Sequence, residues 1–171
     1  MDRERIRALQ ATAMFGALRE DALAWLLERA KPRSVARGAS FFEQGDRGGS
    51  AFLLERGRVS VVKLWEGREH LLRRLSAGDC FGEVALLDFG PRSASVRADE
   101  DAAALEFGAR DLRELARFDP EQFALVYMNL GRELSRRLRD ADERLFRASV
   151  SAAAGERAGS GPAVGYVFVA S

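Results

Sequence analysis

Residues 78–98, GDCFGEVALLDFGPRSASVRA, are the most informative stretch of the chain. Within them, Phe81-Gly82-Glu83 leads into a short apolar run at residues 84–87, which is long enough for one or two helical turns. The first amide groups of a helix have no acceptor inside it, and together with the helix dipole they favour an anion at that end. The pattern therefore predicts an anion site at the start of a short helix.

Three residues of this stretch indicate which anion is bound. Arg92 supplies a guanidinium whose planar fork can hold two oxygens of one phosphate group. Gly82 lets a ligand approach the backbone closely. The carboxylate of Glu83 would repel a phosphate in a partly dry site unless it faces a hydroxyl donor, such as a ribose 2′-OH. The stretch thus predicts a site for a phosphate joined to a sugar.

Each of these residues also has an ordinary structural explanation. Glu83 could be an acidic residue that stabilises the first turn of a helix, and Arg92 could be a surface residue after a Gly90-Pro91 turn. Their occurrence together and in this order, flanked by Gly45-Asp46, Gly57 and Gly78-Asp79, favours the binding site.

The segment FGEVALL followed by PRSASV resembles the phosphate-binding cassette of cyclic-nucleotide-binding domains, and the variant ending in Arg-Ser-Ala resembles that of the bacterial catabolite-activator group. The resemblance covers residues 10–148, approximately, and implies an α+β, mainly β fold. In that fold an eight-stranded jelly-roll-like β-barrel, or double-stranded β-helix, carries N-terminal helices and a long C-terminal helix. The cyclic nucleotide lies between the cassette and the long helix.

The resemblance also implies roles for residues of the cassette, which spans residues 81–96. Glu83 is expected to bind the ribose hydroxyl and Arg92 the exocyclic phosphate oxygens, while the Gly82 and Ser93 amides and the Ser93 hydroxyl add donors. The full set of expected ligand-binding residues is Phe81, Gly82, Glu83, Val84, Ala85, Arg92, Ser93 and Ala94. In the family the long helix closes over the base, which places Arg139, Asp142 and Leu145 near it.

Composition bounds the class of protein. With 47% hydrophobic and 31% charged residues among 171, the chain has the composition of a soluble globular protein. A net charge of +1 gives no electrostatic case for binding DNA or an anionic membrane. The single cysteine, Cys80, permits no internal disulfide, and the single histidine, His70, cannot build a multi-histidine metal site, so no metal or further cofactor is expected. Without a secretion signal or a bilayer-spanning apolar run, a cytoplasmic location is expected.

Hydrophobic periodicity divides the chain into four segments. Residues 1–30 are predicted to hold two helices, at 3–18 and 19–30, with Lys31-Pro32 ending the second. Residues 31–108 contain short β-type runs separated by glycine turns, which predict a sandwich or closed barrel. These runs are residues 34–36, 40–43, 51–55, 59–64, 69–75, 93–98 and 103–107. Residues 109–148 return to helical spacing, and residues 149–171 are expected to form a linker and tail.

The long helix is expected to begin at Asp119-Pro120-Glu121, because aspartate caps a helix and proline suits its first turn, and to end near Phe146 or Ser149. Its apolar residues form a heptad-like seam of Leu130, Leu134, Leu138, Ala141 and Leu145. Such a stripe could simply cover the barrel, but its length favours a homodimer through residues 120–148, as the family resemblance also does. The arginines of this helix are offset by nearby acids, which indicates local ion pairs rather than a DNA contact.

The catabolite activators continue into a helix-turn-helix domain, whereas the Ala/Gly/Ser-rich stretch after Phe146 is too short to form one. The expectation is therefore a stand-alone sensor that signals through movement of the long helix to a downstream protein that the sequence does not name. Residues 164–169 could add a strand to a sheet edge or be disordered.

Three further choices complete the interpretation. An enzyme is not expected, because the sequence has no Cys/His pair and no G-x-S-x-G nucleophile elbow. The alternative to a sensor is an interaction or dimerisation module of the same fold that never binds nucleotide. In the kinase members of the family, a hydroxyl at the position of Ser93 is sometimes associated with a preference for guanine. The catabolite-activator group has a serine there and prefers adenine, so cAMP is expected over cGMP.

Overall fold

The computed structural model describes residues 3–157, with side chains for residues 6–151. Contacts between residues divide the chain into two units, Met1–Gly131 and Arg132–Ser171. The boundary falls inside a single long helix. It therefore does not test the four segments predicted from the sequence, which stay a prediction.

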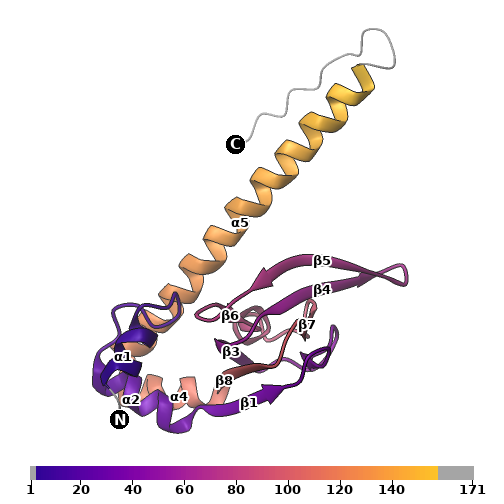
Figure 1. Cartoon of the computed structure of the whole chain (residues 1–171). Coiled ribbons are helices and arrows are strands. Elements are labelled where there is room, and N and C mark those ends of the chain that lie inside the picture. The colour runs from indigo at the N-terminus through magenta and orange to yellow at the C-terminus, as the bar shows by residue number, and fades with distance from the viewer. Residues whose placement is uncertain (1–2, 158–171) are drawn as a thin grey trace. The chain divides into compact units, whose positions relative to one another are not determined.

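The first unit contains eight antiparallel strands in two four-stranded sheets (Figure 1). The first sheet has the order β1 (Lys31–Val35), β8 (Ala102–Gly108), β3 (Ser50–Arg56) and β6 (Cys80–Phe81). The second has the order β2 (Ser40–Phe42), β7 (Ser95–Ala98), β4 (Val59–Trp65) and β5 (Arg68–Leu75). This arrangement confirms the predicted fold, which is mainly β and jelly-roll-like.

Within the first sheet, β3 is buried on both faces. Successive side chains of a strand point to opposite faces. Ala51 and Leu53 accordingly pack in a cluster with the helices, whereas Phe52 and Leu54 belong to a second cluster between the two sheets. The uninterrupted apolar run of β3 follows from this double burial. By contrast, most side chains of β5 in the second sheet are exposed.

Four helices pack against one face of the first sheet: α1 (Arg3–Gln10), α2 (Glu20–Arg29), α4 (Ala109–Phe118) and the first turns of α5 (Pro120–Arg157). The predicted start of the long helix is confirmed, because the Gln122 amide donates to Asp119 Oδ1 at 3.1 Å. Side-chain hydrogen bonds hold the first turns of α5 to the N-terminal loop. The Arg19 amide donates to Gln122 Oε1 at 2.8 Å, and Asn129 Nδ2 donates to the Gly16 carbonyl at 2.7 Å.

Several element boundaries differ from those predicted. α1 ends at Gln10 rather than near residue 18, because the chain turns at Thr12, whose hydroxyl donates to the Leu9 carbonyl at 2.7 Å, and Ala17 has a φ of 63°. β1 begins at Lys31, three residues earlier than predicted, and tolerates Pro32 because it is an edge strand. The two-residue β6 is too short to give a periodic signal, so the sequence did not predict it.

The second unit is described from residue 132 to the end of α5 at Arg157, beyond the predicted end near Phe146 or Ser149. The alanines at residues 152–154 are strong helix formers and explain the extension. Local ion pairs are present as expected, since Glu133 accepts from Arg136 at 2.8 Å and from Arg137 at 2.6 Å. Residues 164–169, considered above as an added strand, lie outside the described residues.

Within residues 3–157, every helix is either too short or too polar to span a bilayer. The same residues bring together no group of three or more His, Cys, Asp or Glu side chains placed to hold a metal ion.

Candidate ligand-binding site

The predicted short helix is present as α3 (Glu83–Leu87), and Gly82 immediately before it has a φ of 75°. This left-handed conformation favours glycine. A β-carbon at this position would lie 2.7 Å from Arg92 Nη1, 3.2 Å from Phe42 and 3.3 Å from Phe52. The sequence analysis explained Gly82 by the close approach of a ligand. In the structure the groups that approach it are the arginine and two aromatic rings.

Arg92 is held in place by the protein itself and is only 5% exposed. Its Nη1 donates to the carbonyls of Ser50 and Gly82 at 2.7 and 2.8 Å, and its Nη2 donates to the Ser50 hydroxyl at 3.0 Å. The guanidinium carbon lies 4.0 Å from the centre of the Phe42 ring, within cation–π range. The guanidinium therefore has a fixed position before any ligand arrives.

Two donors of Arg92 are not used by these bonds. A guanidinium carries five N–H groups, and three of them are engaged. The buried Nε has no hydrogen-bond partner, and Nη2 retains a second N–H. Burial lowers the pKa of Arg92, and the nearby carboxylates of Glu106, Asp46 and Glu83 oppose that shift. A buried cation with two spare donors is suited to an anion with two oxygens.

The other predicted cassette residues fall into two groups. Glu83 is 2% exposed and lies in the first turn of α3, and Phe81, Ala85 and Ala94 are likewise buried. Val84 and Ser93 are exposed. Phe81 stacks on Phe52 with ring centres 5.0 Å apart, so its side chain supports the site from the core. The cassette thus combines a buried acid and arginine with an exposed serine.

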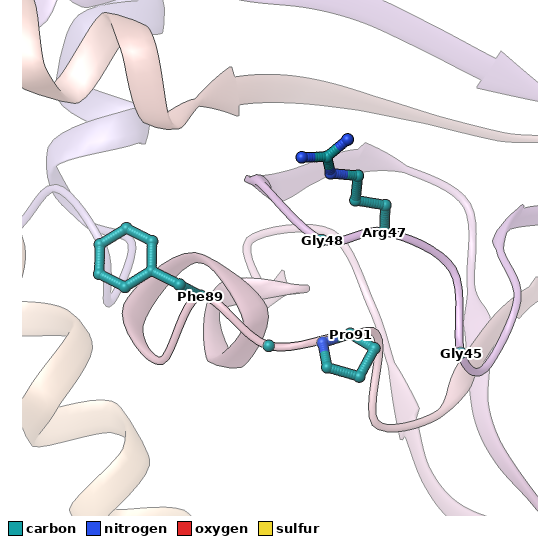
Figure 2. Close-up of a pocket in the computed structure, with 6 residues that line it drawn as sticks. Gly45, Arg47, Gly48, Phe89 and Pro91 are labelled. Atoms are coloured by element: carbon teal, nitrogen blue, oxygen red, sulfur yellow. The ribbon is translucent and has the colours of Figure 1, made fainter.

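Residues 91–92 of the cassette pair through their backbone with residues 45–47. The Gly45 amide donates to the Arg92 carbonyl and the Arg92 amide donates to the Asp46 carbonyl, both at 2.9 Å. Beside this junction lies an open cavity of about 490 Å³, lined by Gly45, Arg47, Gly48, Phe89, Gly90 and Pro91 (Figure 2). Phe89 is 79% exposed at its rim. The sequence analysis did not predict this cavity.

Sequence reasoning also missed the residues that position Arg92, namely Ser50, Phe42 and Phe52. Ser50 lies 42 residues before Arg92 in the chain and carries no motif that would mark it. The base-contacting residues expected on the long helix, Arg139, Asp142 and Leu145, are exposed side chains of α5 in the second unit. Their contact with a base stays a prediction.

The site combines a buried acid and a buried arginine with a left-handed glycine at the start of a short helix, within a jelly-roll fold. Known proteins that share the sequence and fold of this site were compared with the chain. The family model described as "Cyclic nucleotide-binding domain" matches residues 32–118. The chain belongs to this family. The cyclic-nucleotide-binding domain occupies β1 to α4, and it includes both the cassette and the Ser50 side chain that holds Arg92.

Two curated relatives of this domain are bacterial regulators. The Cyclic AMP receptor protein of Thermus thermophilus is 36% identical over 135 residues, which cover 78% of this chain and 61% of the relative. The CRP-like cAMP-activated global transcriptional regulator of Mycobacterium tuberculosis is 29% identical over 138 residues, which cover 80% of this chain and 60% of the relative. The chain therefore spans about three fifths of the length of these relatives.

Among solved structures, the Thermus thermophilus Catabolite Activator Protein is similar to the cyclic-nucleotide-binding domain described here. The two superpose with a TM-score of 0.71 at 36% sequence identity, over 81% of this chain and 63% of that protein. The resemblance to the catabolite-activator group is thereby confirmed.

Proposed function

We propose that this chain binds a cyclic nucleotide at the cassette and regulates another protein in response. The observation that carries the proposal is the state of Arg92, which is buried, fixed by three hydrogen bonds and left with two donors. A phosphate with two free oxygens matches those donors. An arginine with a purely structural role would gain no stability from leaving two buried N–H donors without acceptors.

The finer assignment follows from the residues around Arg92. We place the exocyclic phosphate on Arg92, with the Ser93 hydroxyl as a further donor, and the ribose hydroxyl on Glu83. We favour cAMP over cGMP as the ligand of the cassette, because the named relatives of both bacteria carry cyclic AMP in their descriptions. The role is regulatory rather than catalytic, as the descriptions of these relatives also suggest.

The response is proposed to run through α5. A ligand held by the cassette and touched by Arg139, Asp142 or Leu145 would bias the position of that helix. The size of this bias is limited by the difference between the ligand's affinities for the two helix positions. The helix would also join two copies of the chain. The competing proposal is a dimerisation module that binds no nucleotide.

Titration calorimetry with cAMP and with cGMP separates the two proposals. The protein is first unfolded and refolded to remove ligand carried through purification. We expect about one site per chain. In Arg92→Ala the affinity should fall by about 100-fold or more, because two hydrogen bonds to a charged group are lost and each is worth roughly 1.5–3 kcal/mol. A folded protein that binds neither nucleotide would instead favour the dimerisation module.

Two further variants make this test specific. Arg97→Ala removes a half-buried arginine of β7 that pairs with Glu69 on the outer side of the barrel, and it should bind like the natural chain. Arg92→Lys keeps the positive charge but lacks the planar, forked donor geometry of the guanidinium. Since Arg92→Ala also removes the donor to two backbone carbonyls, we expect it to be less stable by about 1–3 kcal/mol, and circular dichroism should verify that it is folded.

A further inference from the structure

Phe89 occupies a position where a phenylalanine does not help the chain to fold. Among the exposed large apolar side chains of residues 6–151, it has the largest exposed fraction, at 79%. Its φ of 57° is left-handed, a conformation that strains a bulky residue. The Gly90 amide donates to Asp88 Oδ1 at 2.9 Å across this strained turn. The stability of the domain therefore does not account for Phe89, and a contact with another molecule would.

The open cavity beside Phe89 also presents an unpaired cation (Figure 2). Among the described residues that line this cavity, Arg47 alone carries a charge. Its side chain is exposed and makes no hydrogen bond or ion pair within the described part of the chain. The neighbouring carboxylates of Asp46 and Asp88 each accept a hydrogen bond from a backbone amide of their own loop. The cavity thus combines a positive charge with an exposed aromatic ring.

This combination indicates the chemistry of an occupant. A guanidinium is complemented by a carboxylate, and the Phe89 ring by an apolar side chain. Arginine and aromatic residues are also the types that contribute most at interfaces between proteins. A small ligand is normally enclosed over most of its surface, whereas this cavity is open and its rim is exposed. An acidic and apolar segment that remains part of another protein fits these features better than a free metabolite does.

The walls of the cavity are connected to the group that is proposed to hold the nucleotide. A β-carbon at Gly48 would lie 2.2 Å from the Ala85 β-carbon and 2.7 Å from the Gly90 carbonyl, so the backbone beside Arg47 packs directly on α3 and on the loop that follows it. The same segment exchanges backbone hydrogen bonds with Arg92. A molecule in the cavity therefore touches the outside of the loop that positions Arg92.

We propose that this cavity binds a short segment of a partner protein, with a carboxylate of the segment on Arg47 and an apolar side chain on Phe89. We further propose that nucleotide at Arg92 changes the affinity for this segment, because both contact the same loop. Only this link to the nucleotide rests on the proposed function. The docking site itself follows from the cavity, its cation and its strained aromatic residue.

A phage-displayed library of short random peptides, panned on the full chain in the presence of cAMP, tests the docking site. We expect enriched peptides that carry an acidic residue close to a leucine or an aromatic residue. A synthetic peptide with the enriched sequence should bind about tenfold or more weakly to Arg47→Glu and to Phe89→Asn, measured by fluorescence anisotropy. Arg37→Glu and Trp65→Ser, which change an exposed arginine and an exposed aromatic residue elsewhere on the barrel, should bind it like the natural chain.

Thermal unfolding of Phe89→Asn tests the role of Phe89 without any partner. Asparagine tolerates a positive φ, so this variant should unfold at the same temperature as the natural chain or at a higher one. A clearly lower unfolding temperature would show that Phe89 stabilises the domain and would overturn the proposal. Failure to enrich any peptide that depends on Arg47 and Phe89 would also overturn it. Loss of self-association in Arg47→Glu, seen by light scattering, would identify a second copy of the chain as the occupant and contradict a partner protein.

The link to the nucleotide has its own measurement. The affinity of the enriched peptide should change by about fivefold or more when cAMP is added, and the affinity for cAMP should change by the same factor when the peptide is added. If the chain binds no nucleotide but still binds the peptide through Arg47 and Phe89, the proposed function and the link are wrong and the docking site stands. If both ligands bind and neither alters the affinity of the other, only the link is overturned.

Discussion

At the scale of single residues, the site depends on a glycine and an arginine that require each other. Gly82 adopts a left-handed conformation, and its carbonyl accepts a hydrogen bond from Arg92 at 2.8 Å. The same guanidinium occupies the space that a side chain at Gly82 would need. Any residue other than glycine would therefore both strain the backbone and displace the Arg92 guanidinium.

This relation predicts the behaviour of Gly82→Ala. The positive φ should cost about 1 kcal/mol, and displacement of Arg92 by the new methyl group should weaken nucleotide binding by about tenfold or more. Calorimetric titration and thermal unfolding measure the two effects. Gly67→Ala is the control, because Gly67 also has a positive φ but no atom lies within 4 Å of its added β-carbon. Equal loss of affinity in both variants would contradict the explanation.

At the scale of an element, α5 has two different faces in its second part. One carries a cluster in which Glu133 is buried and bonded by Arg136 and Arg137. The other carries apolar residues that stay exposed, with Leu138 at 62% and Leu145 at 69%. The first stabilises the helix itself, and the second is available to another surface.

The ion pairs of Glu133 with Arg136 and Arg137 predict that the stability of α5 depends on pH. Burial raises the pKa of Glu133, but hydrogen bonds from Arg136 and Arg137 outweigh burial, and the pKa lies below its ordinary value. A carboxylate with a lowered pKa contributes stability above its unfolded pKa and loses it as the pH falls through the folded value. Protection of the amides of residues 133–141 from hydrogen exchange should therefore fall as the pH drops below about 4.

Glu133→Gln should have this weaker protection already at neutral pH and should show little further change in acid. Glu143→Gln, which removes an exposed partner of Arg147, should behave like the natural chain. The same acid transition in Glu133→Gln would show that another carboxylate is responsible.

The exposed apolar face of α5 predicts self-association. Leu138 and Leu145 are seven residues apart, as expected for a seam between two helices. We expect the natural chain to be a dimer by light scattering, and Leu138→Glu with Leu145→Glu to be a monomer, because charges in an apolar seam are costly. Leu64→Glu, on the exposed face of the barrel, should stay a dimer. A natural chain that is monomeric throughout would contradict the prediction.

At the scale of the whole molecule, the chain consists of a domain that holds a ligand site and a helical unit that continues from it. The helix α5 runs unbroken across the boundary between Gly131 and Arg132, so these two residues are joined by helix and not by a loop. This continuity supports the proposal that α5 carries the response of the site.

The proposed response can be measured directly. Spin labels at Arg37, on an exposed turn of the barrel, and at Arg144, on α5, should give a different distance distribution when cAMP is added. In Arg92→Ala the distribution should not respond to the nucleotide. If it is the same with and without cAMP in the natural chain, movement of the helix is not the output.

The sequence by itself determined the fold class, the cassette and the start of the long helix. Short β-type runs between glycines, the order of Gly82, Glu83 and Arg92, and the Asp119-Pro120 cap are local patterns, and local chemistry is sufficient to interpret them. Boundaries were less accurate where packing overrode the local pattern, as at the early end of α1 and in the edge strand β1.

Only the tertiary structure decided what surrounds Arg92 and which way Arg73 projects. Ser50, Phe42 and Phe52 reach Arg92 from other strands, so no spacing in the chain records the contact. The orientation of Arg73 depends on a shift of register between β4 and β5 near Val61 and Val62. Because a shift of one residue exchanges the two faces of a strand, the sequence alone cannot tell whether Arg73 or Arg74 lies on the face of β5 that carries Leu75.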